Sequence, residues 1–87
     1  MRLDKFLKVS RLIKRRTLAK EVCDKGRIQI NGQVAKAGST VKAGDELVIK
    51  FGQKTVTVKV EAIRDIVRKE EAGTMYTIVS ETSNAAD

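Results

Sequence analysis

The sequence predicts a small α+β domain in which two N-terminal helices pack on a small, mostly antiparallel sheet. Apolar residues recur at helical spacing in the first quarter of the chain, beginning at Leu3. After Gly26 the spacing changes to an alternation of period two, which is typical of half-buried strands. The chain has 87 residues and no linker-like stretch, so we expect one domain over residues 1–80 and a flexible tail over residues 81–87.

The first predicted helix carries its apolar residues on one face. Leu3, Phe6 and Leu7 have the i, i+3, i+4 spacing of a short amphipathic helix. Asp4 lies near its beginning, where a carboxylate complements the helix dipole. Two further roles are open for Asp4: an ion pair with Lys8 one turn on, or a contact that holds a neighbouring arginine in a fixed pose for a phosphate.

The second predicted helix begins near Thr17 and ends at Gly26. Thr17 is expected to cap it, and a glycine just past the last turn suits the left-handed position there. Arg15 and Arg16 precede or begin this helix, where unpaired N–H groups already favour an anion, so they form either a phosphate clamp or a solvated pair. The apolar residues of the helix are Leu18, Ala19, Val22 and Cys23, and the thiol is expected to be buried and unreactive.

Strands are expected in the rest of the chain. Asn31 and Gly32 predict a type I′ turn within a hairpin that spans residues 28–34. The segment over residues 65–72 is charged and fits either a helical turn or an irregular excursion. Further strands are predicted over residues 47–51, 55–60 and 75–79.

The net positive charge of the chain lies in its first third. Residues 2–30 carry ten basic side chains against three acidic ones, a net +7, whereas the remainder carries eight of each. A localised cationic face on a small domain is typical of nucleic-acid binding. Of the three aromatic residues, Phe6 and Phe51 are expected in the core, which leaves little surface for stacking single-stranded bases. We therefore predict recognition of folded RNA through phosphates and 2′-hydroxyls.

Other classes of function are less well supported. With no histidine, one cysteine and no glycine-rich phosphate loop, the sequence argues against an enzyme, and neither a metal site nor a cofactor is expected. A DNA-binding architectural protein and an interaction module for an acidic protein partner both share the cationic face and stay open. The charged N-terminus has no apolar run, so we expect a cytoplasmic protein.

The candidate RNA-binding residues are nine of the ten basic side chains of residues 2–30 and three polar neighbours. Asn31 at the hairpin tip could contact sugar or base, although the turn alone is sufficient reason for an asparagine. The full set is Arg2, Asp4, Lys5, Lys8, Arg11, Lys14, Arg15, Arg16, Thr17, Lys20, Arg27 and Asn31.

Several short motifs resemble a known family in their order and spacing. They are Arg2-Leu3-Asp4, Arg16-Thr17-Leu18-Ala19, the run from Gly26 to Gly32, and Gly44-Asp45 before an apolar strand. Over about residues 1–51 they are similar to the RNA-binding domain of ribosomal small-subunit protein four, the S4-type domain. This resemblance implies an S4-like (alpha-L) fold and RNA contacts by Arg2, Asp4 and Arg16.

The whole length resembles a family of stand-alone bacterial S4-type proteins, the RqcP family of ribosome-associated quality control. The matching stretches in the second half are residues 51–54, 70–72 and 75–78. This resemblance implies binding to a stalled, split large ribosomal subunit that still carries peptidyl-tRNA. It further implies contacts with 23S rRNA and support of alanine tailing by the factor RqcH, and it relates the chain to a small ribosome-binding heat-shock protein.

Overall fold

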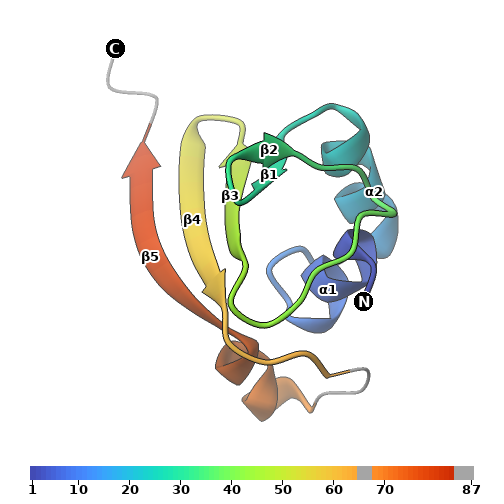
Figure 1. The fold of residues 1–87 in the computed structure, drawn as a ribbon, viewed down its shortest axis with the longest axis vertical. Helices are drawn as coiled ribbons and strands as arrows, with labels where there is room; N and C mark the ends of the chain where they lie inside the picture. The colour runs from blue at the N-terminus through green and yellow to red at the C-terminus, as the bar shows by residue number, and fades with distance from the viewer. Residues whose placement is uncertain (65–67, 84–87) are drawn as a thin grey trace.

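The computed structural model describes residues 1–64 and 68–83. Two helices lie against one face of a five-stranded antiparallel sheet with the strand order β2-β1-β3-β4-β5 (Figure 1). This arrangement confirms the predicted α+β class. The elements in chain order are α1 (Leu3–Val9), α2 (Arg16–Asp24), β1 (Ile28–Ile30), β2 (Gln33–Val34), β3 (Glu46–Phe51), β4 (Lys54–Val60), the 3-10 helix η1 (Lys69–Met75) and β5 (Tyr76–Ser83).

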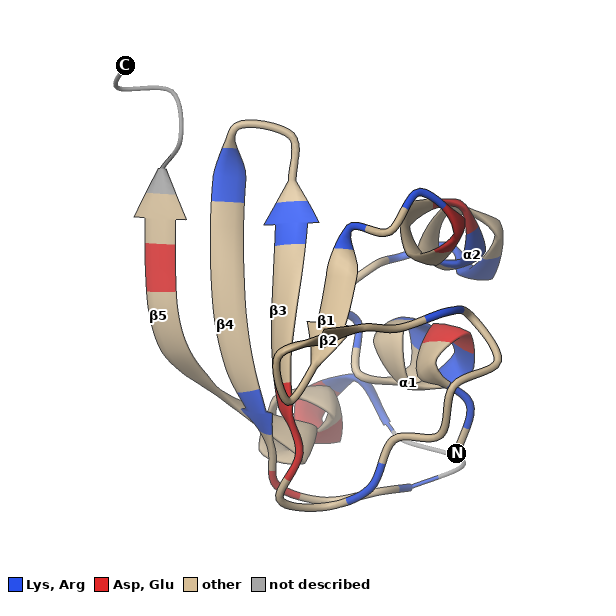
Figure 2. Cartoon of the chain, turned by 45° about the horizontal axis from the view of Figure 1, so that its top comes forward, with Lys and Arg blue, Asp and Glu red and all other residues tan. Residues whose placement is uncertain are grey.

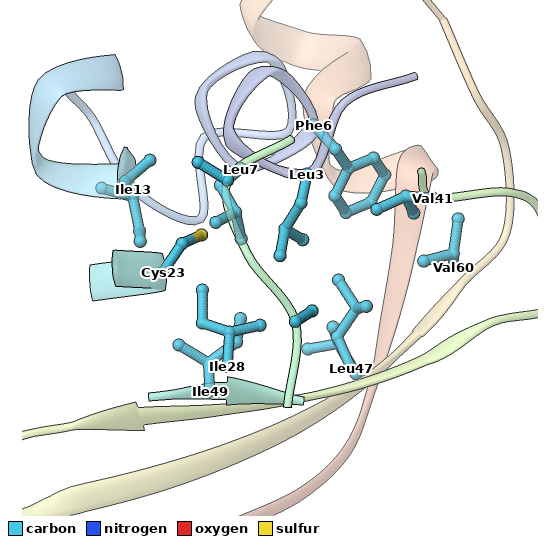
Figure 3. Packing of buried hydrophobic residues seen from close by; sticks show 14 of the residues in the cluster. Leu3, Phe6, Leu7, Ile13, Cys23, Ile28, Val41, Leu47, Ile49 and Val60 are labelled. Carbon is cyan, nitrogen blue, oxygen red and sulfur yellow. The ribbon is translucent and has the colours of Figure 1, made fainter. Parts of the chain in front are cut away.

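The core lies between the helices and the sheet, as the apolar spacing predicts. Leu3, Phe6 and Leu7 of α1 are fully buried. Leu3 and Leu7 face Ile28 of β1 and the inward-facing residues of β3, and Phe6 lies beside Val41 (Figure 3). Phe51 is only half-buried and packs at the margin of this cluster, so its predicted place in the core is only partly correct.

The end of α2 is as predicted, but its beginning is not. Gly26 adopts φ +71°, its N–H donates to the Cys23 carbonyl, and the next N–H donates to the Val22 carbonyl, which together form a Schellman motif. The helix starts one residue before Thr17, with Arg15 as the N-cap and no side-chain cap. The prediction that Thr17 caps α2 is therefore wrong, because its hydroxyl already lies inside the first turn.

The apolar stripe of α2 is narrower than the sequence suggests. Ala19 and Cys23 are buried against α1 and the sheet, and Val22 is partly buried. Leu18 keeps 48% of its surface exposed. Residues one position apart on a helix diverge by about 100°, so Leu18 and Ala19 cannot both face the core of a two-layer domain.

The first hairpin forms through the predicted turn. Asn31 and Gly32 have φ of +52° and +86°, the two positive values of a type I′ turn, and Ile30 pairs with Gln33 across it. In β4 the alternation of buried and outward-facing residues matches the predicted period of two. The register of the first hairpin is therefore set by a local sequence signal.

The C-terminal strand is longer than predicted. Met75 ends η1, and β5 runs from Tyr76 through Ser83, pairing along the whole of β4 with one register shift. The first three residues of the predicted tail thus belong to the sheet, and residues 84–87 lie outside the described residues. In the undecided segment over residues 65–72, the described part enters η1 at Lys69. No helix in the described part of the chain is long and apolar enough to span a membrane.

Candidate nucleic-acid interface

A buried carboxylate joins the first turns of α1 and α2. Asp4 is only 3% exposed. Arg2 reaches it with two groups, Nε 3.2 Å from Oδ1 and Nη2 3.5 Å from Oδ2. Arg16 places its own Nε 3.5 Å from Oδ2. Two half-exposed guanidinium groups from different helices are thus held beside one carboxylate, which is the arginine-holding role considered for Asp4. Its ion pairs within residues 1–64 and 68–83 are with these arginines and not with Lys8.

The environment keeps Asp4 ionised. Burial raises the pKa of Asp4, but the hydrogen bond from Arg2, the Lys5 N–H bond at 2.8 Å and the charges of Arg16 and Arg2 outweigh it. The net result is a pKa below the usual value of 3.8. The carboxylate therefore retains its negative charge, and its hold on both arginines, at neutral pH.

The N-terminus of α1 is closed by a loop from elsewhere in the chain. The N–H of Leu3 donates to the Ser39 carbonyl at 2.8 Å, and the N–H of Asp4 donates to the Ala37 carbonyl at 3.2 Å. Arg2 also forms an isolated β-bridge with Thr40. The loop over residues 35–40 thereby fixes the backbone on both sides of the Arg2 side chain.

The N-terminus of α2, in contrast, is open. Within residues 1–64 and 68–83, no protein group accepts a hydrogen bond from the backbone N–H groups of Arg16, Thr17 or Leu18. No acidic residue lies in this first turn. Free N–H groups and the positive end of the helix dipole favour an anion here, and Arg16 stands at the same place. The clamp predicted from the sequence pairs Arg16 with Arg15, but Arg15 is the N-cap residue and lines a hollow beside Leu18 and Phe51.

A second group of cations gathers where α1 ends. Lys8, Arg11 and Lys14 line a hollow of about 390 Å³ together with Lys69 from η1. Lys69 is far from the other three in the sequence, and no acidic residue within residues 1–64 and 68–83 lines the hollow. Figure 2 shows basic segments on both helices and on their connection, whereas the middle of β3 and of β4 carries none.

The other predicted basic residues lie around these two groups. Lys5 is partly buried on α1, one turn from Arg2, and Lys20 is exposed on α2, one turn from Arg16. Thr17 is exposed in the first turn of α2. Arg15 lines a hollow next to Leu18 and Phe51. Arg27 lines another hollow beside the same two residues, and this one also includes two basic residues outside the predicted set. Those additional residues are Lys25 and Lys50.

Asn31 is occupied within the protein. Its Nδ2 donates to Oδ1 of Asp45 at 3.1 Å, and its Oδ1 accepts from the N–H of Glu46 at 3.0 Å. These bonds connect the hairpin turn to the start of β3. They give the asparagine a structural role, which was one of its two sequence-based explanations.

Cys23 and the acidic residues offer no further chemistry in the described part of the chain. Burial, with the charges of Asp4 and Asp24, raises the pKa of Cys23 from 9.0 to about 11. Within residues 1–64 and 68–83, no cluster of three or more histidine, cysteine, aspartate or glutamate residues could hold a metal ion.

Lys69, like Lys25 and Lys50, is absent from the residues predicted from the sequence. It lies in the segment whose structure the sequence left undecided, and its charge is balanced there by Glu70 and Glu71. A local pattern contains no signal that η1 returns to the end of α1. Only the fold brings Lys69 to Lys8 and Arg11.

The fold and the two cationic groups together define a small domain of the nucleic-acid-binding class. Comparison with known proteins makes the class specific: the family model described as "S4 domain" matches residues 1–47. A protein named "RQC P-site tRNA stabilizing factor" from Halalkalibacterium halodurans is 70% identical, over 93% of this chain and 92% of its own. The factor of the same name from Bacillus subtilis is also 70% identical, over 93% of this chain and 94% of its own.

A solved structure agrees with these relatives. The trimeric structure of Vibrio cholerae heat shock protein 15 superposes with a TM-score of 0.84 at 33% identity, covering 92% of this chain and 82% of that one. The chain belongs to the S4 domain family, and within it to the family of RQC P-site tRNA stabilizing factors, the RqcP family.

Proposed function

We propose that this protein binds folded RNA on the large ribosomal subunit and takes part in ribosome-associated quality control. Its RNA ligands are 23S rRNA and the peptidyl-tRNA of a stalled, split ribosome, and its binding supports alanine tailing by RqcH. The protein acts in the cytoplasm as a non-catalytic factor. Membership of a family whose members are named P-site tRNA stabilizing factors supports this proposal.

The single observation that carries RNA binding is the meeting of Arg2 and Arg16 at Asp4. Each arginine Nε lies within 3.5 Å of the buried carboxylate, and Arg16 begins a helix whose N-terminal N–H groups are free in the described part of the chain. Arg2 and Arg16 expose 56% and 51% of their side chains, so their remaining N–H groups are open to solvent. Planar guanidinium groups with free N–H donors suit bidentate contacts with phosphate oxygens.

The test compares Arg16→Ala with Lys59→Ala. Both variants remove one exposed positive charge, but Lys59 lies on β4, outside the cationic groups. Sedimentation with purified large subunits should show a loss of binding of at least tenfold for Arg16→Ala and less than twofold for Lys59→Ala. Arg2→Ala should behave like Arg16→Ala, and circular dichroism should show that all three variants fold. Equal losses for Arg16→Ala and Lys59→Ala would refute the assignment.

Salt dependence and competition separate the remaining alternatives. If about five basic residues meet phosphates, log affinity should fall with log salt at a slope of roughly −4. Duplex DNA that competes as well as ribosomal RNA at fixed salt would indicate an architectural DNA-binding protein instead. Survival of the complex after RNase treatment would indicate an acidic protein partner.

A further inference from the structure

The helices α1 and α2 end in the same backbone conformation with different residues. After α2, Gly26 adopts φ +71° and its N–H donates to the Cys23 carbonyl at 2.9 Å. After α1, Arg11 adopts φ +64° and its N–H donates to the Lys8 carbonyl at 3.1 Å. This position favours glycine, because a side chain in the left-handed region crowds its own backbone. An arginine is thus kept where stability alone would select glycine or asparagine.

Arg11 borders the hollow that Lys8, Lys14 and Lys69 also line. Four formal positive charges converge there. Within residues 1–64 and 68–83, none of the four forms an ion pair or a side-chain hydrogen bond. Like charges held together repel one another, so this grouping is a second feature that opposes stability.

We propose that this hollow is a second phosphate-binding site, which takes a backbone phosphate of RNA at a point separate from the site that Arg2 and Arg16 form beside Asp4. A bound phosphate would relieve the mutual repulsion of the four cations. A contact with this phosphate would also explain why an arginine occupies the strained position. The inference rests on the proposed function, since it takes RNA to be the ligand.

The two sites lie at opposite ends of α1. Arg2 precedes the helix and Lys8 lies near its end, so a rise of about 1.5 Å per residue separates the sites by roughly 9 Å along the axis. Lys5 lies on α1 between them. A single RNA segment lying along α1 can therefore contact both sites.

The second site depends on the C-terminal half of the chain. The S4 domain match covers residues 1–47, whereas Lys69 comes from η1. The site is thus assembled from the S4 unit and the segment that follows β4, and Lys69 is its most specific probe.

The test compares Lys69→Gln with Lys59→Gln in the full chain, with a hairpin RNA that has an A-form stem as the probe. Fluorescence anisotropy at several salt concentrations should show an affinity loss of about fivefold for Lys69→Gln and a salt slope shallower by up to about 1. Lys59→Gln should leave the affinity and the salt slope within error of the wild-type values. Equal effects of the two variants would overturn the proposal, because only overall charge would then matter.

A second variant separates binding from folding. Arg11→Gly removes the guanidinium and the backbone strain together, so it should raise the melting temperature by about 2–5 °C while lowering RNA affinity about tenfold. An unchanged affinity would overturn the proposal, because Arg11 would then not contact the phosphate.

These outcomes are distinguishable from failure of the proposed function. If wild-type protein does not bind the hairpin or ribosomal subunits, RNA binding itself is wrong. If Arg16→Ala abolishes binding while Lys69→Gln behaves like Lys59→Gln, the site formed by Arg2 and Arg16 stands and only the second site is refuted.

Discussion

The Nε of Arg16 lies 3.5 Å from Oδ2 of Asp4, and this contact joins the first turn of α2 to the first turn of α1. Asp4 is nearly buried, whereas half of the Arg16 side chain is exposed. The buried carboxylate of Asp4 is therefore paired with a guanidinium group that stays exposed to solvent. We propose that Asp4 positions Arg2 and Arg16 for RNA, and two measurements test this role.

Asp4→Asn should weaken RNA binding although it makes the protein more positive. The neutral amide cannot hold the two guanidinium groups as a carboxylate does, so their fixed arrangement is lost. We expect the dissociation constant for a hairpin RNA to rise five- to tenfold at fixed salt, by fluorescence anisotropy. Asp24→Asn, which removes a carboxylate at the end of α2, is the matched control. It should bind slightly more tightly, and the same gain in Asp4→Asn would contradict the positioning role.

The contribution of Asp4 to stability should disappear in acid. Its pKa is lower in the folded chain than the usual 3.8, so the folded state binds the proton less tightly than the unfolded state. The contribution is complete above the unfolded pKa, begins to fall near pH 4 and is lost as the pH drops through the folded pKa. Denaturant unfolding of wild type and Asp4→Asn from pH 7 to pH 2 should show a constant difference that shrinks only below about pH 4. A difference that does not depend on pH would show that the carboxylate charge is unimportant.

The thiol of Cys23 should be inert in the folded protein. Only 1% of the residue is exposed, and burial raises the pKa of Cys23 from 9.0 to about 11. Because the thiolate is the reactive form, an aromatic disulfide reagent at pH 8 should label the native protein at least a hundredfold more slowly than the unfolded protein. The unfolded chain loses this proton first, so stability should also decline as the pH rises from about 9 towards 11. Rapid native labelling would show that α2 opens readily.

Asn31→Ala should destabilise the protein without changing its affinity for RNA. The variant loses two side-chain hydrogen bonds and places alanine at φ +52°, which together should lower the free energy of unfolding by about 2–3 kcal/mol. Asn31→Gly keeps the turn conformation and loses only the bonds, so it should cost about 1 kcal/mol less. Chemical denaturation gives both values. A tenfold loss of RNA affinity in the folded glycine variant would instead support a direct contact with RNA.

Features encoded by short stretches of sequence were predictable. The spacing of Leu3, Phe6 and Leu7 predicts α1 because a helix repeats every 3.6 residues. Asn31 and Gly32 predict the turn because both accept positive φ, and Gly26 predicts the end of α2 for the same reason. The sequence placed Arg16 at or just before the N-terminus of α2, although it wrongly gave Thr17 as the cap.

Features that depend on contacts between distant segments were not predictable from the sequence. Whether Asp4 would pair with Lys8 or with an arginine was open, because the crossing of α1 and α2 decides it. The exposure of Leu18 depends on which side of α2 meets the sheet. The approach of Lys69 to the end of α1 depends on the path of the chain after β4, where the local composition is balanced in charge.

The sharing of one buried carboxylate by two arginines affects the entropy of association. A free arginine samples many rotamers, and fixing such a side chain on binding costs about 0.5–1.5 kcal/mol. In this protein that restriction of Arg2 and Arg16 is imposed during folding, through Asp4, and not when RNA arrives. In the complex with RNA that we propose, this surface would be preorganised, and more of the attraction to phosphate would be available as affinity. A lysine in place of either arginine would lose this advantage and the planar guanidinium geometry.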